Sequence, residues 1–532
     1  MANGETVTCT INGVEVTVPK GARIIEAAEQ IGVGIAHYCY HPGLSAPAMC
    51  RMCLVEVEGA PKLAPACVTT VADGQAVHTE SEKALEARKG TLEFYLLNHP
   101  LDCPVCDKSG ECKLQDYAHV EGRRVGRSIE PKRILGQDDF GGDILYDGDR
   151  CIMCTRCVRF MREIARDDRL CVVQRGSRSV IDTFFEEGLE GSPWAGNIVD
   201  ICPVGALLSK DFLHKARVWD LDGAPSVCPN CSQGCNVRID TRDNLVMRLR
   251  PRPNPDVNSY WMCDYGRQHH EWLNALDRIE MPLMRVDGLL EPVTWQGAIL
   301  ALVERLGAIG ADAGVLAVGS AMHGNEDNGL LARLAGRVEG AQLVYRSPLA
   351  EDEAPCPGVP GLARRRELAA NGRGLEALGF RRVGTAAGTG GIEPPADGLL
   401  IAVGDDLGDI AADTLAAAGL RVALATAPTP AVLAADFVLP VTTCAEQEGT
   451  FTNHAGRVQR FWPALQPPPL ARPAWQVLGV VLAGLGDGGA PADAGGAFLR
   501  VAELFPAFGG LSYDRLGAQG APLAEAAAAE SA

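Results

Sequence analysis

The placement of cysteine constrains this chain more than any other feature of its sequence. Fifteen of the 19 cysteines fall into four groups between Cys39 and Cys263, and His99 stands beside an incomplete group. Disulfides do not persist in a reducing compartment, so this many closely spaced thiols predict metal binding. The spacings favour iron–sulfur clusters over zinc. Four such clusters along one stretch of chain predict a path for electrons.

Length and charge narrow the class of protein further. A chain of 532 residues is expected to form several domains. Its formal charge of −18 argues against nucleic acid or an anionic membrane surface as a partner. The sequence has no apolar run long enough to span a bilayer, and residues 1–20 lack the apolar stretch of a signal peptide. We therefore expect any membrane contact to be indirect, through a complex.

The first group consists of Cys39, Cys50, Cys53 and Cys67, with ten, two and thirteen residues between them. A long gap, a close pair and a distant fourth cysteine are typical of a loop that wraps a [2Fe–2S] cluster. A structural zinc site is the alternative.

The second group has only three cysteines, Cys103, Cys106 and Cys112, with His99 four residues ahead of them. Because three thiolates cannot complete a four-iron cluster, we predict His99 as the fourth ligand of a [4Fe–4S] cluster.

The third group is Cys151, Cys154, Cys157 and Cys202, and its spacing resembles half of a two-cluster bacterial ferredoxin. In such proteins the fourth cysteine of each run binds the other cluster. Here Met161 occupies that fourth place after Cys157. Counting back from Cys202, the three remaining ligand positions hold Ser192, Ala195 and Ile198. All ligands of one cluster are thus lost and all ligands of the other are kept, which predicts one [4Fe–4S] cluster.

The fourth group is Cys228, Cys231, Cys235 and Cys263, with gaps of two, three and twenty-seven residues. This spacing favours another [4Fe–4S] cluster, with a zinc ribbon as the alternative. Four cysteines remain. We expect Cys9, Cys171 and Cys444 to serve in core packing, whereas Cys356 is a candidate metal-binding thiol.

The pattern between the cysteines predicts the fold. Residues 6–11 and 14–18 alternate in polarity around Asn12-Gly13, which predicts a β-hairpin, and residues 23–31 carry a helical apolar face. A charged helix is predicted over 81–97. Beyond 282, apolar runs at 314–318, 398–403 and 422–425 alternate with helical segments at 295–306 and 328–338. This alternation predicts a mostly parallel sheet.

Several short motifs resemble one family, the large iron–sulfur subunit of respiratory complex I, which is the G-type subunit of bacterial NADH–quinone oxidoreductase. The resemblance covers residues 6 to about 277 closely. Its motifs are His-Pro-Gly-Leu (41–44), Cys-Arg-Met-Cys-Leu-Val-Glu-Val (50–57), Asp-Cys-Pro-Val-Cys-Asp (102–107), Gly-Glu-Cys-Lys-Leu-Gln-Asp (110–116), Arg-Cys-Ile-Met-Cys-Thr-Arg-Cys-Val-Arg (150–159) and Cys-Pro-Val-Gly-Ala-Leu (202–207). After about residue 281 the chain is more weakly similar to molybdopterin oxidoreductases, best at 448–453 and 456–459.

The resemblance implies one [2Fe–2S] cluster on the first group and a [4Fe–4S] cluster on each of the other three, with no molybdopterin. The fourth cluster would be the additional one that some bacterial members keep away from the main electron path. The implied partners are a flavin subunit that oxidises NADH and other peripheral-arm subunits, on the cytoplasmic side of the bacterial inner membrane. In active molybdenum enzymes a Lys closely follows the last cluster cysteine, whereas this chain has Tyr265 there.

We therefore predict a multidomain α+β and α/β chain. Its predicted parts are a β-grasp [2Fe–2S] ferredoxin domain (1–80), a [4Fe–4S] domain with one histidine and three cysteine ligands (81–128), a ferredoxin-like domain with one [4Fe–4S] cluster (129–220), an additional [4Fe–4S] domain of molybdopterin-oxidoreductase type (221–278), a degenerate molybdopterin-oxidoreductase-like α/β domain (279–484) and a Gly/Ala-rich tail (485–532), with a linker over 485–497.

Three other functions fit parts of this pattern. An NAD-coupled molybdenum formate dehydrogenase shares the iron–sulfur front end, and Cys356 would be its metal-binding thiol. The surroundings of Cys356 in Ala354-Pro355-Cys356-Pro357 do not resemble the ligand motif of those enzymes. An iron-only hydrogenase needs further cysteine motifs in the C-terminal half, where only Cys356 and Cys444 occur. A scaffold with four zinc sites is the third alternative. The sequence favours an electron relay with no substrate site of its own.

Overall fold

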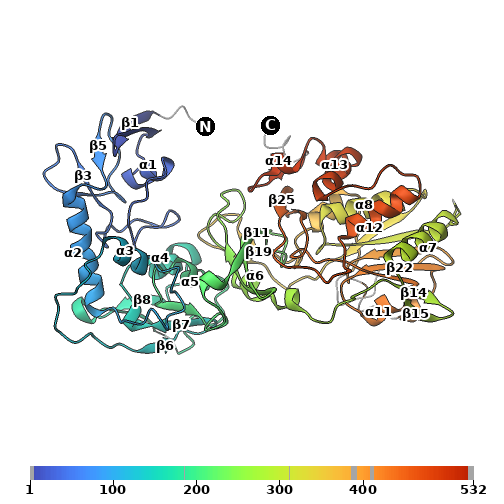
Figure 1. Cartoon of the computed structure of the whole chain (residues 1–532), viewed down its shortest axis with the longest axis horizontal. Coiled ribbons are helices and arrows are strands. Elements are labelled where there is room, and N and C mark those ends of the chain that lie inside the picture. Colours follow the sequence, from blue (N-terminus) through green and yellow to red (C-terminus); the bar gives the residue numbers. More distant parts are fainter. Residues whose placement is uncertain are drawn as a thin grey trace. The chain divides into compact units, whose positions relative to one another are not determined.

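The computed structural model describes residues 5–524, with the exception of 185, 311, 385–391, 406 and 408–411. The chain divides into two compact units (Figure 1). The N-terminal unit is Met1–Leu221 with Pro357–Pro360, and the C-terminal unit is Asp222–Cys356 with Gly361–Ala532. The finer division into six domains stays a prediction. In the part of the chain that the structure describes, no helix is long and apolar enough to cross a membrane.

The N-terminal unit begins with a five-stranded sheet and one helix. Asn12 (φ 52°) and Gly13 (φ 82°) both adopt the left-handed conformation that a type I′ hairpin turn requires. The strands lie in the order β2-β1-β5-β3-β4, with β1 parallel to β5 and the other pairs antiparallel. The elements are β1 (Thr6–Ile11), β2 (Val14–Pro19), α1 (Ile24–Gln30), β3 (Leu54–Val57), β4 (Ala64–Pro65) and β5 (Ala76–His78). The predicted hairpin and helix are confirmed.

The rest of the N-terminal unit consists of one long helix and many short elements. Ser81 caps the long helix, because its hydroxyl accepts a hydrogen bond from the backbone N–H of Ala84 (3.3 Å). The helix predicted there is confirmed as α2. The elements are α2 (Glu82–Asn98), α3 (Lys113–Glu121), β6 (Gln137–Asp139), β7 (Ile144–Asp147), η1 (Gly148–Arg150), α4 (Arg156–Phe160), η2 (Met161–Ala165), β8 (Leu170–Val173), η3 (Gly176–Arg178), β9 (Val180–Thr183), α5 (Asn197–Ile201), β10 (Leu207–Ser209) and η4 (Val218–Asp220). The loops between these elements carry the second and third cysteine groups, except for Cys157, which lies in the first turn of α4.

The C-terminal unit opens with a small antiparallel sheet in the order β11-β12-β13, followed by two short helices. These elements are β11 (Asp222–Val227), β12 (Asn236–Arg242), β13 (Leu245–Pro251), α6 (Asp264–Gln268) and η5 (Glu271–Asn274). The loop between β11 and β12 and the start of α6 carry the fourth cysteine group.

An eight-stranded sheet forms the centre of the C-terminal unit, in the order β15-β14-β23-β22-β21-β16-β17-β20. The strands from β23 to β20 pair in parallel, and β14 and β15 add an antiparallel edge. Every residue of β16 and of β21 is buried, as expected for a parallel sheet covered on both faces. The strands are β14 (Leu283–Val286), β15 (Leu289–Pro292), β16 (Val315–Ser320), β17 (Gln342–Arg346), β20 (Arg381–Arg382), β21 (Leu399–Val403), β22 (Leu420–Ala425) and β23 (Phe437–Pro440). The mostly parallel sheet predicted from the sequence is confirmed.

Helices and two small sheets complete the C-terminal unit. The helices are α7 (Trp295–Gly307), α8 (Asn325–Ala335), α9 (Gly372–Ala377), α10 (Ala412–Leu415), α11 (Pro430–Leu433), α12 (Ala474–Gly484), α13 (Ala494–Leu504), η6 (Pro506–Phe508) and α14 (Tyr513–Leu516). The remaining strands are β18 (Ala354–Pro355), β19 (Ala363–Arg364), β24 (Gly449–Thr452), β25 (Arg457–Phe461) and β26 (Ala521–Pro522).

The C-terminal segment differs from the predicted linker and tail. Residues 494–504 form helix α13, so the linker prediction over 485–497 is wrong at its end. Phe498 and Val501 of this helix are fully buried and belong to the core of the α/β sheet. The prediction failed because small residues hid the helix, whereas burial of a few large apolar side chains stabilises it. Residues 521–522 pair with β25, so the tail is ordered at least to there. The low-complexity sequence of 517–532 predicts a frayed end, which is wrong at 521–522, and residues 525–532 lie outside the described residues.

Candidate iron–sulfur centres

The structure brings the four thiols of the first group together. Cys39, Cys50, Cys53 and Cys67 are all buried, on the loop after α1 and around β3 and β4. The thiols of Cys50 and Cys67 hydrogen-bond to the sulfur of Cys39 and lower its pKa. The same contacts raise the pKa values of Cys50 and Cys67. A hydrogen bond to Cys67 also lowers the pKa of Cys53. Four buried thiols linked by hydrogen bonds match the donor set of a [2Fe–2S] cluster.

The second group has a nitrogen atom that lacks a partner. Nδ1 of His99 is buried and, among the described residues, makes no hydrogen bond. Burial, and then the charge of Arg150, lower the pKa of His99 to about 4, so the imidazole is in the neutral form that binds metals. Arg150 also lies close enough to Cys106 for their charges to interact. The neutral imidazole and the cysteines of this group therefore share one neighbour, which fits the prediction of His99 as a ligand.

The backbone leaves room for the sulfurs of the second group. A Cβ atom at Gly205 would lie 2.2 Å from Sγ of Cys106, so only glycine fits there. Cys106 and Cys112 are buried, and burial raises the pKa of Cys112 to about 11. Cys103 is exposed. This group is therefore more open to its surroundings than the other three.

The third group converges as the sequence predicts. The pKa of Cys154 is raised to about 12 by burial and by the charge of Cys202, and that of Cys157 is raised by burial and by Cys154 and Cys151. Met153 and Thr155, between the three closely spaced cysteines, adopt left-handed conformations that turn the backbone around the sulfurs. These thiols would be protonated near neutral pH, so thiolates here require the positive charge of a bound metal.

The positions of the lost second cluster are filled by protein. Met161, Ala195 and Ile198, which replace three of the four expected cysteines, are buried. Apolar side chains thus stand where a second ferredoxin cluster would need thiolates. This packing agrees with one cluster, and not two, in this part of the chain.

The fourth group lies in the C-terminal unit, where Cys228, Cys231, Cys235 and Cys263 are all buried. The backbone N–H of Cys228 donates to the carbonyl of Cys235 (2.8 Å) and closes the loop around the sulfurs. A Cβ atom at Gly266 would lie 3.0 Å from Sγ of Cys228 and 3.5 Å from Sγ of Cys263. Burial, and then the charges of Cys231 and Cys228, raise the pKa of Cys263. The donor set and the glycine that makes room for it fit a cluster.

All 19 cysteines are free thiols in the structure. Among the described residues, no three His, Cys, Asp or Glu side chains are arranged to hold a single metal ion. Ligation of clusters by the four groups therefore stays a prediction. Of the remaining cysteines, Cys9 is buried in the core of the first sheet, as predicted, and Cys171 is half-buried, with its thiol near the carbonyl of Asp182 (3.5 Å).

A cavity of about 500 Å³ in the C-terminal unit was missed by the sequence reasoning. Ser320 and Arg346, the last residues of β16 and β17, line it, so it lies at the carboxyl ends of parallel strands, where ligands bind in such sheets. Cys444 lines this cavity and Cys356 does not. The prediction that Cys444 serves only in core packing is incomplete, and the cavity gives no support to Cys356 as a metal-binding thiol.

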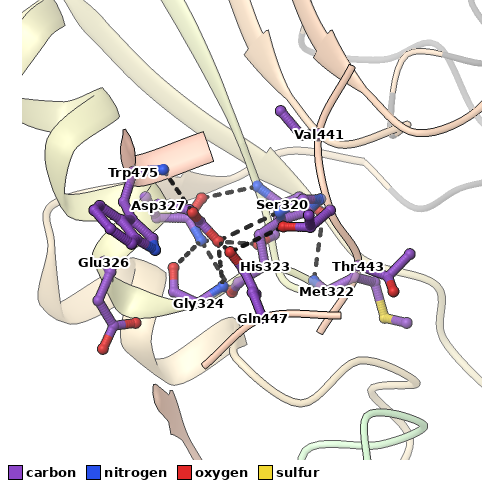
Figure 2. Close-up of polar contacts among 12 residues, drawn as sticks. Ser320, Met322, His323, Gly324, Glu326, Asp327, Val441, Thr443, Gln447 and Trp475 are labelled. Atoms are coloured by element: carbon purple, nitrogen blue, oxygen red, sulfur yellow. Dashed lines mark hydrogen bonds and ion pairs between the residues drawn. The ribbon is translucent and has the colours of Figure 1, made fainter. Parts of the chain in front are cut away.

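A buried polar network borders this cavity (Figure 2). The carboxylate of Asp327, fully buried on α8, accepts hydrogen bonds from Gln447 Nε2 (2.8 Å) and from the backbone N–H of Trp475 (2.8 Å) and Gly324 (3.1 Å). Nδ1 of His323 lies 3.4 Å from the same carboxylate. The run Asn325-Glu326-Asp327-Asn328 was the signal for this network, because four polar residues in succession are unusual in a buried helix.

Five protein-family models match parts of this chain. Residues 4–82 match a 2Fe-2S iron-sulfur cluster binding domain, and 88–127 match an NADH-ubiquinone oxidoreductase-G iron-sulfur binding region. Residues 141–208 match the ferredoxin-like domain of NADH-quinone oxidoreductase subunit 3. Residues 223–275 match the Fe4S4 domain of molybdopterin oxidoreductases, and 408–483 match the molybdopterin oxidoreductase model. Parts of the chain therefore match iron–sulfur and molybdopterin-oxidoreductase domain models, and the predicted fold class is confirmed.

Curated relatives make the comparison more specific. The chain is 39% identical over 299 residues to the G-type subunit of NADH-quinone oxidoreductase from Rickettsia felis, 56% of this chain and 44% of the relative. It is 41% identical over 317 residues to the G-type subunit from Streptomyces coelicolor, 59% of this chain and 38% of the relative. It is 43% identical over 295 residues to the mitochondrial NADH dehydrogenase [ubiquinone] iron-sulfur protein 1 of Solanum tuberosum, 55% of this chain and 40% of the relative.

The predicted resemblance to the large iron–sulfur subunit of complex I is therefore confirmed over the matched residues, which are homologous to the G-type subunit of NADH-quinone oxidoreductase. The chain spans less than half the length of these relatives. A solved chain of an NAD+-reducing [NiFe]-hydrogenase is 28% identical to this chain. The matched region covers 40% of this chain and 91% of the hydrogenase chain. Its TM-score of 0.36 is below the level of a shared overall fold.

Proposed function

We propose that this chain is an iron–sulfur electron-relay subunit of an NADH–quinone oxidoreductase, the respiratory complex I. In this proposal it accepts electrons from a flavin subunit that oxidises NADH and passes them toward quinone through neighbouring subunits. The observation that carries the proposal is the spacing of fifteen cysteines and His99 in four groups along the chain, with thirteen of the fifteen thiols buried. The names of the homologous subunits support it.

The proposed ligands are those predicted from the sequence. Cys39, Cys50, Cys53 and Cys67 would hold a [2Fe–2S] cluster, and three [4Fe–4S] clusters would be held by His99 with Cys103, Cys106 and Cys112, by Cys151, Cys154, Cys157 and Cys202, and by Cys228, Cys231, Cys235 and Cys263. When bound, such clusters supply one-electron transfer. The protein's own contribution is to bury the thiolates, to donate hydrogen bonds to the sulfurs and to set the ligand type.

Electrostatic contacts between groups support a relay within the N-terminal unit. The charge of Arg156 interacts with Cys39 of the first group and with Cys154 and Cys202 of the third. Cys112 of the second group interacts with Cys202 of the third. The three groups are therefore neighbours, and short separations favour electron transfer because tunnelling rates fall steeply with distance.

Exposed apolar side chains support partners near the second group. Phe94 is 77% exposed, Leu101 89% and Val105 61%. Large apolar side chains gathered on one surface mark sites where another protein binds. We propose that a neighbouring peripheral-arm subunit of the complex covers this surface and holds the chain on the cytoplasmic side of the bacterial inner membrane.

The test compares two cysteine variants in the assembled complex. Cys103→Ala is expected to abolish NADH–quinone activity and to leave NADH–ferricyanide activity, because that dye accepts electrons nearer the flavin. Cys231→Ala, in the group away from the main path, is expected to lower stability or assembly while the assembled fraction keeps its quinone activity. Equal loss of both activities in Cys103→Ala, with assembly intact, would contradict the relay.

The cofactor content has its own test. Metal analysis after anaerobic purification is expected to give about 14 iron atoms per chain and no molybdenum. A value of about 10 iron atoms would mean that one four-iron cluster is missing, and the group of Cys228 would be the one without a cluster. Stoichiometric molybdenum would favour the formate dehydrogenase alternative instead.

A further inference from the structure

A second cavity, of about 460 Å³, lies in the N-terminal unit among the first three cysteine groups. Its walls come from α1, from the loop on both sides of Cys39, from α3 and from α4. None of the sixteen predicted cluster ligands lines it. It is therefore distinct from the cluster sites. The side chains that decide its chemistry are His37, His41, Lys113, Tyr117 and Arg156.

Arg156 is a buried cation in this cavity wall, with only 4% of its surface exposed. Its guanidinium donates to the backbone carbonyls of Ile201 (3.1 Å) and Tyr40. Its Nε is buried and, among the described residues, has no hydrogen-bond partner. Neutral carbonyls thus take two of its donors, and no carboxylate of the described residues forms an ion pair with it, although its charge also interacts with the thiols of the first and third cysteine groups. A buried cation in this state favours an anion beside it.

Lys113 is the second cation of the cavity. Its Nζ lies 3.2 Å from Nε2 of His37. Nδ1 of His37 lies 2.7 Å from the carbonyl of Ile35, so this nitrogen carries the proton and Nε2 accepts from Lys113. The ammonium group is therefore paired with a neutral ring. The charges of Glu29, the exposed carboxylate in the lining, and of Asp116 also act on Lys113, but among the described residues neither forms an ion pair with it.

Tyr117 adds a neutral donor. Its hydroxyl oxygen accepts from the backbone N–H of His37 (3.4 Å), which leaves its own O–H free to donate. An ammonium group, a guanidinium and a phenol on one cavity match an oxyanion, because charge-assisted hydrogen bonds from Arg and Lys to carboxylate or phosphate are the strong ones. A volume of a few hundred Å³ suits a small molecule.

We propose that this cavity binds a small oxyanion, either inorganic phosphate or a small organic carboxylate, through Lys113, Arg156 and Tyr117. The position gives the anion a role that rests on the proposed function. Lys113 follows Cys112 directly, Arg156 precedes Cys157, and His37 and His41 flank Cys39. A bound negative charge would disfavour reduction at all three groups, so the anion would shift their midpoint potentials to more negative values.

Binding is tested first, on the anaerobically purified chain with its iron bound. Calorimetric titrations with phosphate and with citrate are expected to show one saturable site for which the two compete, and glycerol, a neutral probe, is expected not to bind. Lys113→Gln is expected to weaken binding about 10- to 100-fold, since a hydrogen bond to a charged group is lost. Lys113→Arg keeps the charge and is expected to restore binding.

The control is Lys89→Gln, because Lys89 is a half-exposed lysine on α2 whose ion-pair partner among the described residues is Glu86 (2.9 Å). It should bind like the unmodified chain. If Lys113→Gln loses iron, Tyr117→Phe replaces it and is expected to weaken binding several-fold. No saturable binding, or equal binding in these variants, would overturn the site.

A redox titration followed by electron paramagnetic resonance then tests whether the bound anion shifts the midpoint potentials. If the anion binds but the midpoint potentials do not shift, the proposed effect on the clusters is wrong and the binding site still stands. Neither result depends on whether the chain is an electron relay in complex I.

Discussion

The N-terminal unit and the α/β sheet of the C-terminal unit are stabilised in different ways. In the sheet, β16 and β21 are buried at every residue, and helices α12 and α13 contribute to one large apolar core. In the N-terminal unit, α4 and α5 have five residues each, and buried thiols and buried cations occupy much of the interior between them. Buried thiolates and cations do not stabilise a fold without counter-charges. The first sheet of the N-terminal unit has an apolar core of its own. We infer that the eight-stranded sheet folds by apolar burial, whereas the part of the N-terminal unit around the second and third cysteine groups depends on bound metal.

Iron removal has the largest expected effect and tests this difference directly. Without iron, amides around the second and third groups, in residues 99–112 and 151–165, are expected to lose nearly all protection from hydrogen exchange. Amides of β16 and β21 are expected to keep their protection, because metal binding stabilises only the part of the fold that supplies the ligands. Hydrogen exchange with mass spectrometry, before and after chelation and after reconstitution, measures both. Equal loss of protection in both places would break the comparison.

Glu326 gives the sheet a pH dependence of its own. Burial raises its pKa to about 8, although its carboxyl accepts from Thr450 N–H (2.9 Å) and Tyr513 O–H (2.9 Å), and the charge of Asp327 raises it further. The folded chain therefore holds a proton that the unfolded chain releases near its ordinary pKa of 4.5. Stability is fully present below that value and is lost as the pH rises to about 8, by about 1.4 kcal/mol for each unit of raised pKa.

The measurement is the melting transition of the sheet by scanning calorimetry at pH 5.5 and at pH 8.5. Glu326→Gln is expected to flatten the dependence and to melt higher at pH 8.5, because it cannot ionise. Glu376→Gln is the matched control, since Glu376 is exposed and pairs with half-exposed Arg373, and a glutamine there can still accept from the Tyr345 hydroxyl. A pH dependence that persists in Glu326→Gln would assign it to another group.

Phe498→Ala tests the apolar core where the sequence suggested a tail. Phe498 is fully buried and contacts the rings of Phe508 and Tyr513, with centroids 6.2 and 5.6 Å away. Loss of a buried Phe typically costs about 3–5 kcal/mol. The calorimetric transition of the sheet should fall while the iron content stays unchanged. Leu499→Ala, on the exposed neighbour, is expected to change stability by less than about 0.5 kcal/mol.

The same difference decides what the sequence could predict. Local signals were sufficient for the hairpin at Asn12-Gly13 and for the apolar runs that became β16, β21 and β22. The predicted membership of each cysteine group likewise rests on ligand spacing, which is mostly a local pattern. The cavity near Cys444 was not readable, since residues as distant in sequence as Asn230 and Cys444 form it. Helix α13 was missed for the same reason, because its stability comes from tertiary contacts.

The smallest expected effect concerns the helix that joins the first and second cysteine groups. Ser81 caps α2 through its hydroxyl (3.3 Å to the N–H of Ala84), and Ser81→Ala is expected to cost about 1 kcal/mol. If the N-terminal unit depends on metal, this loss should appear as faster hydrogen exchange in the first turn of α2 in the iron-free chain and be almost masked once iron is bound. Ser81→Asp, which keeps a capping oxygen, should restore protection. Equal effects of Ser81→Ala with and without iron would mean that α2 is stable by itself, and the dependence on metal would then be confined to the cysteine loops.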